Sequence, residues 1–194
     1  TLNKIKIIMG LDMYLSKHTY VKRWDHQSKE EKFSVNVKKG GRVYAPIKKD
    51  RVSYIIETVM YWRKANQIHN WFIENLAGGE DNCQEIYVPF DKLVELRDTC
   101  KKVLDACELK KGVVKNGYTF KNGVKEPNLE EGDMIVGGED VCEELLPSSS
   151  GFFFGSADYD QWYYEDVENT YKELTELVEE PDAESGDYYY LASW

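Results

Sequence analysis

The segment YIIETVMYWRKANQIHNWFIENL, residues 54–76, contains neither proline nor glycine, and its apolar residues recur at helical spacing. At about 100° per residue, one face of such a helix collects Ile55, Val59, Trp62, Ile73 and Leu76. The pattern predicts one long central helix that packs this face against the rest of the domain and ends at Gly78-Gly79.

Polar residues interrupt the apolar face of this predicted helix. Asn66 and His69 fall on the face itself, and Arg63 and Asn70 fall at its margin. A buried polar side chain without a partner costs roughly 1–3 kcal/mol, so these groups must meet hydrogen-bonding atoms of the protein or of a ligand. Either His69 joins the helix to a sheet, or the group binds an anionic or heteroaromatic ligand, which an arginine can grip bidentately.

Three residues outside the helix complete this candidate site. Asp12 and Asp81 are acidic partners for Arg63 or His69, and Tyr14 offers a ring for stacking. We therefore predict a ligand-binding site composed of Arg63, Asn66, His69, Asn70, Asp12, Tyr14 and Asp81.

The rest of the sequence predicts an α+β domain, with three main helices packed on a small, mostly antiparallel sheet. Alternating residues, a glycine-turn hairpin and short apolar runs predict strands near residues 11–16, 33–47, 85–88 and 186–191. Three consecutive phenylalanines, residues 152–154, predict a further strand buried on both faces. Helical spacing predicts long helices at 91–109 and 161–180 and a short one at 140–146.

We expect residues 9–194 to form a single domain, with residues 1–8 an upstream segment that precedes the natural start. Asn-Gly pairs at 116–117 and 122–123 indicate turns in an exposed insertion near residues 110–138.

Charge divides the chain sharply. Residues 1–125 hold 24 Lys and Arg against 15 Asp and Glu, whereas residues 126–194 hold only Lys172 against 20 acidic residues. The two parts either neutralise each other in the fold, or the acidic part presents a negative surface to a basic partner. A modest basic edge at residues 38–51 is more typical of a solvated turn, and we expect no direct binding of nucleic acid.

Common catalytic and metal-binding patterns are missing from the sequence. Its four cysteines form no CxxC pair and its three histidines have no metal-ligand spacing, so we expect no metal and no cofactor. Nucleophile-elbow, Walker and dinucleotide-binding motifs are also missing, and catalysis by His69 with a distant nucleophile stays open. Since no apolar run reaches membrane-spanning length, we expect a reduced, cytoplasmic protein without a membrane partner.

Three stretches together resemble an uncharacterised family of small proteins encoded by bacteriophages and prophages. They are MGLDMYL at residues 9–15, YWRKANQIHNWF at 61–72, and the LP…GFFFG stretch at 146–155 followed by DYDQWY at 158–163. The resemblance spans most of the chain and implies an accessory role in the cytoplasm of an infected bacterium, where such proteins often antagonise a host system or sequester its signals.

Three functions are therefore weighed. The first is a non-enzymatic phage accessory protein that binds a small anionic or nucleotide-like ligand on the central helix. The second is an acidic protein that binds and blocks a host nucleic-acid-binding enzyme. The third is a small hydrolase that uses His69.

Overall fold

The sheet is assembled around β1 (Asp12–Tyr20), which pairs with β4 (Tyr54–Arg63) on one side and with β8 (Asp187–Ser193) on the other. β5 (Ile86–Val88) pairs with the far side of β8, so the strand order is β4-β1-β8-β5 and all these pairings are antiparallel. The computed structural model describes residues 10–121, 123–151 and 154–194, and it confirms the α+β class.

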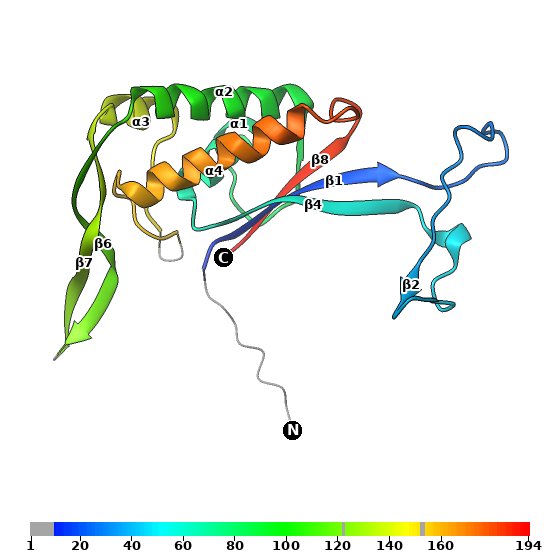
Figure 1. Ribbon diagram of the computed structural model, residues 1–194, viewed down its shortest axis with the longest axis horizontal. Helices are drawn as coiled ribbons and strands as arrows, with labels where there is room; N and C mark the ends of the chain where they lie inside the picture. Colours follow the sequence, from blue (N-terminus) through cyan, green and yellow to red (C-terminus); the bar gives the residue numbers. More distant parts are fainter. Residues whose placement is uncertain (1–9, 122, 152–153) are drawn as a thin grey trace.

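The helices lie on one face of this sheet (Figure 1). They are α1 (Asn66–Leu76), α2 (Phe90–Ala106), the short α3 (Glu139–Leu145) and α4 (Gln161–Val178). The core forms between the two layers, where Phe72 of α1 stacks on Tyr190 of β8 with ring centroids 4.0 Å apart. Trp62 joins the layers by donating from Nε1 to Oγ1 of Thr170 on α4, at 2.8 Å.

The predicted central helix is wrong over its first half, because residues 54–63 form strand β4. This stretch is rich in β-branched and aromatic residues, which fit a pleated, half-buried surface better than a helix. The strand alternation is visible at its end, where Met60 and Trp62 are buried and Tyr61 is half exposed. Lys64 then adopts a positive φ of 63°, and α1 begins at Asn66.

Two arms extend from the body of the molecule (Figure 1). One, residues 21–53, connects β1 to β4 and contains the two-residue strands β2 (Lys38–Lys39) and β3 (Arg42–Val43) and a 3-10 turn, η1 (Lys49–Arg51). The other is a long hairpin of β6 (Glu108–Lys121) and β7 (Val124–Gly137), which occupies the predicted insertion. Its strands reverse between residues 121 and 124, and Asn116-Gly117 lies instead at a shift of register within the pairing.

The predicted strands at 11–16, 85–88 and 186–191 and the three predicted helices after residue 90 agree with the structure to within a few residues. The predicted hairpin over 33–47 is wrong in extent, because only the two-residue strands β2 and β3 form around its glycine turn and residues 33–37 form no strand. Asp160 caps α4, since its Oδ1 accepts from the main-chain N–H groups of Trp162 and Tyr163 at 3.0 and 3.2 Å. Trp162, in the first turn of α4, is 38% exposed. The predicted strand 152–154 falls largely outside the described residues, as does the segment 1–8. Within the described chain, no helix has the length and apolarity needed to cross a bilayer.

Candidate functional site

His69 is buried in a hydrogen-bonded network rather than facing a cavity. Its Nδ1 lies 2.7 Å from the hydroxyl of Tyr190, and its Nε2 lies 3.0 Å from Oδ2 of Asp81. The carboxylate of Asp81 can only accept, so Nε2–H of His69 donates to it. Nδ1 is then the acceptor for the hydroxyl of Tyr190, whose pKa is raised by burial.

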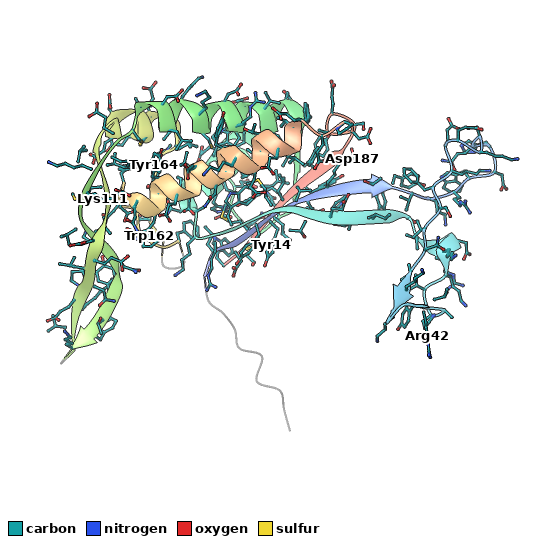
Figure 2. The ribbon with its side chains drawn as sticks, viewed as in Figure 1. Tyr14, Arg42, Lys111, Trp162, Tyr164 and Asp187 are labelled. Atoms are coloured by element: carbon teal, nitrogen blue, oxygen red, sulfur yellow. The ribbon has the colours of Figure 1, made fainter. Side chains whose placement is uncertain are left out.

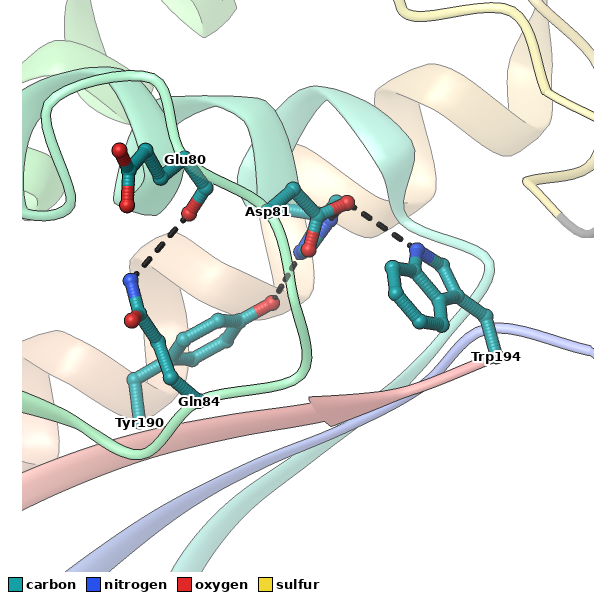
Figure 3. Close-up of polar contacts among 6 residues, drawn as sticks. Glu80, Asp81, Gln84, Tyr190 and Trp194 are labelled. Atoms are coloured by element: carbon teal, nitrogen blue, oxygen red, sulfur yellow. Dashed lines mark hydrogen bonds and ion pairs between the residues drawn. The ribbon is translucent and has the colours of Figure 1, made fainter.

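Asp81 also accepts from the indole Nε1 of Trp194 at 3.0 Å, so the network links the loop after α1 to both α1 and the end of β8 (Figure 3). A carboxylate that orients a histidine resembles part of a hydrolase relay. Here, however, His69 is only 2% exposed and both ring nitrogens are occupied. The arrangement therefore stabilises the packing of α1 on the sheet.

Asn66 has a similar structural role at the start of α1. Its Oδ1 accepts from the main-chain N–H of Ser149 at 2.8 Å, and its Nδ2 donates to the carbonyl oxygens of Phe154 and Ser156 at 3.0 and 2.7 Å. The buried amide thus fixes both ends of the loop that leads to α4.

The other predicted site residues separate into different places. Asp12 and Tyr14 lie on β1, on the face of the sheet away from the helices, where Asp12 is opposite Arg63 in the register and accepts from the hydroxyl of Tyr61. Asn70 is half-buried on α1. Of the seven predicted residues, the structure brings His69 into contact with Asp81 and sets Asp12 beside Arg63, but it does not gather the seven into one site.

Arg63 alone among them lines a large cleft. This cleft has a volume of about 760 Å3, within the range of roughly 300–1,000 Å3 that is usual for small-molecule sites. Its walls are formed by the end of β4, the start of α1, residues 148–151 and 155–158 of the loop before α4, the first half of α4 and the hairpin β6–β7. Besides Arg63, the residues that define its chemistry are Lys64, Gln67, Lys115, Asp158, Trp162 and Asp166.

Some charged side chains of the cleft have an oppositely charged partner and others do not. Lys115 of the hairpin pairs with Asp158 of the loop at 2.8 Å, and Asp160 is occupied as the helix cap. Arg63 and Lys64, by contrast, form no ion pair with any other residue that the structure describes. The end of the cleft at β4 is therefore its most cationic part.

Asp166 is the titratable group of special interest in the cleft. Burial raises its pKa to about 7, although a long hydrogen bond of 3.5 Å from Nε2 of Gln67 opposes the shift. The negative charges of Glu165 and Asp160 add to the increase. A carboxyl group that changes charge near neutral pH, on the wall of a cleft, is typical of a functional site.

Sequence reasoning did not identify Lys64, Gln67, Lys115, Trp162 or Asp166. One signal for Asp166 was present, because it lies three residues after Tyr163 and four before Thr170 on the buried stripe of α4. An acidic residue at such a position predicts a buried or half-buried carboxyl group. For Lys115 the sequence offers no signal, since only the fold sets the hairpin beside α4.

No three His, Cys, Asp or Glu residues of the described chain gather as metal ligands. Comparison with protein-family models, with curated proteins and with solved structures gives no match for this chain.

Proposed function

We propose that the chain binds a small anionic ligand of nucleotide-like chemistry in the cleft beside Arg63. The observation that carries the proposal is the pair of neighbouring cations, Arg63 and Lys64, which line the cleft and form no ion pair with any described residue, although acidic side chains line other parts of the cleft. A guanidinium offers bidentate hydrogen bonds to phosphate or carboxylate, and the adjacent ammonium adds a point charge.

The opposite wall supports a planar, hydrogen-bonding group on the same ligand. Trp162 exposes part of its ring at the cleft, and Gln67 and Asn116 carry amides there. Asp166 completes this wall, and when protonated it donates a hydrogen bond instead of repelling an anion. The affinity for the anion is therefore expected to increase as the pH falls through about 7.

The ligand site replaces the one predicted on the central helix. Arg63 is retained from that prediction. Asn66 holds a loop of the cleft through its hydrogen bonds to Ser149, Phe154 and Ser156, and His69 belongs to the separate network with Tyr190 and Asp81. The resemblance to phage-encoded proteins suggests a role for this binding. We propose that the protein is an accessory protein that sequesters a small signalling molecule of the host cell.

Thermal unfolding of the full chain with a panel of nucleotides and inorganic phosphate tests the proposal. A nucleotide that raises the Tm of the wild type but not of Arg63→Ala supports it. Arg97→Ala is the matched control, since Arg97 lies on α2, outside the cleft, and is bonded to Asp98. The proposal is wrong if no member of the panel stabilises the protein, or if Arg63→Ala is stabilised as much as the wild type.

A second candidate function rests on the outward face of α4. Glu165, Glu173 and Glu176 are exposed along it, and the helix's single lysine, Lys172, is paired with Glu168 at 2.8 Å. Such a negative stripe suits a basic surface of a nucleic-acid-binding enzyme. Salt-sensitive inhibition of a host nuclease or polymerase, lost when these three glutamates are changed to glutamine, would favour this function.

A further inference from the structure

The face of the sheet that the described helices leave uncovered bears an aromatic ring on each of its four strands. Following the strand order, these rings are Tyr54 of β4, His18 of β1, Tyr189 of β8 and Tyr87 of β5. Neighbouring ring centroids lie 6.4 Å apart for His18 and Tyr54, 4.4 Å for His18 and Tyr189, and 5.6 Å for Tyr87 and Tyr189. We call this row the aromatic stripe.

More aromatic rings widen the surface around the aromatic stripe. Tyr14 and Tyr61 lie against each other with centroids 5.2 Å apart, and Tyr20 contacts Tyr54 at 5.1 Å. Tyr54, Tyr61 and Tyr87 are each about half exposed, at 50%, 51% and 52%. A contiguous exposed patch of this kind marks a binding surface, because such area is usually buried in a monomeric protein.

The charge around the aromatic stripe is divided. Asp187 lies opposite His18 and, together with Glu85, acts electrostatically on Tyr189, whereas the arm beyond Tyr20 is basic. The arm of residues 21–53 begins directly after Tyr20 and holds ten Lys and Arg against four Asp and Glu. Figure 2 shows Arg42 of this arm beyond the ends of β1 and β4, on the side of the sheet toward which Tyr14 points and away from the helices. The acidic helix α4 lies on the opposite face of the sheet (Figure 1).

Aromatic rings on an open antiparallel sheet, continued by a basic segment, match the chemistry of single-stranded nucleic acid. Unpaired bases stack on exposed tyrosines with little sequence preference, and lysine and arginine neutralise the phosphates. We propose that this face binds single-stranded nucleic acid, with bases on Tyr87, Tyr189 and Tyr54 and the backbone continuing toward Lys38, Lys39 and Arg42. The sequence prediction did not favour such binding, because the basic edge at residues 38–51 was considered without the aromatic surface that the fold places on the sheet.

Fluorescence anisotropy with labelled mixed-sequence single strands of DNA and RNA tests the proposal, at low salt and with a salt titration. Tyr87→Ala and Tyr189→Ala are each expected to weaken binding about five-fold or more. The double variant Lys38→Glu/Lys39→Glu should weaken it further and flatten the dependence of affinity on salt. Circular dichroism and thermal unfolding establish that each variant is folded.

Matched controls come from the other parts of the described chain. Phe120→Ala removes an exposed ring on the β6–β7 hairpin, and Lys102→Glu/Lys110→Glu reverses two exposed charges outside the arm. Both should bind like the wild type.

Three outcomes would overturn the proposal. The first is no binding at low salt. The second is binding of duplex as tight as that of single strands, or binding that the tyrosine variants leave unchanged. The third is a wild-type oligomer in sedimentation that Tyr87→Ala dissociates while no oligonucleotide binds, which would assign the face to a protein interface instead.

Discussion

Nε2 of His69 lies 3.0 Å from Oδ2 of Asp81, and the bond connects the buried side of α1 to the loop that follows it. The opposite ring nitrogen accepts from Tyr190 of the inner strand β8, so one imidazole joins a helix, a loop and the sheet. The geometry explains why a histidine lies in an otherwise apolar setting.

The first prediction concerns this network. His69→Ala removes the partner of the Tyr190 hydroxyl and one of the two partners of Asp81 and leaves a cavity, so it should lower the free energy of unfolding by about 3 kcal/mol or more. Chemical denaturation measures the change. His26→Ala is the control, because His26 is exposed, and it should be close to neutral. A small effect of His69→Ala would show that the buried network contributes little to stability.

The second prediction concerns Asn66. Its amide makes three hydrogen bonds to main-chain atoms of the loop 149–156, so Asn66→Ala should cost about 2–4 kcal/mol. The main-chain amide of Ser149 should also lose its protection in hydrogen exchange. Asn82→Ala, at an exposed position, provides the comparison. Unchanged protection at Ser149 would contradict the assigned role.

The third prediction concerns the pH dependence of stability. Because Asp166 has a folded-state pKa of about 7, above its ordinary value, the unfolded chain loses this proton at lower pH than the folded protein does. The destabilisation from this group therefore grows as the pH rises from about 4 to 7 and stays constant above. Asp166→Asn should raise the free energy of unfolding by roughly 2–4 kcal/mol at pH 8 and by little near pH 4.

Denaturation curves of the wild type and Asp166→Asn across this pH range provide the measurement. Glu173→Gln, on the exposed face of α4, should show no such pH-dependent gain. A gain of equal size at pH 4 and pH 8 would show that Asp166 is not the titrating group.

The fourth prediction concerns Gly138, which precedes α3 with a φ of 84°. A side chain there would be in an unfavourable backbone conformation and would also collide with the main-chain carbonyl of Ala106, at the end of α2. Gly138→Ala should thus destabilise the protein by about 2 kcal/mol or more. Gly78 also has a positive φ, but the space around it is open. Gly78→Ala should therefore lower the free energy of unfolding by only about 1 kcal/mol. Equal Tm losses in the two variants would rule out the collision.

The sequence predicted the class of fold and most elements because their signals are local. Helical spacing in α2 and α4 and the Gly78-Gly79 pair just after α1 depend on neighbours within a few residues. The helix predicted over residues 54–63 was wrong because an apolar run that matches helical spacing can also form a strand. Pairing with β1 favours the strand here. Nothing local foretold the positive φ at Lys64.

The site was predicted less well for a related reason. Buried polar residues were identified correctly as needing partners, and Asp81 was a correct partner for His69. Whether those partners are protein or ligand depends on distant main-chain atoms, such as the carbonyl of Ser156 that Asn66 contacts. The cleft itself forms where the β6–β7 hairpin approaches α4, and spacing along the chain cannot reveal such an approach.

The pairing of β1 with β8 has a consequence for how the chain acquires its structure. Met13 lies opposite Ala192, so the two inner strands of the sheet come from opposite ends of the described sequence. Contacts between residues so far apart in the sequence form slowly, because the intervening chain must first be ordered at an entropic cost. During synthesis, the apolar side chains of β1 and β4 therefore stay exposed until β8 has left the ribosome. A chaperone that shields them in this interval should therefore increase the yield of native protein.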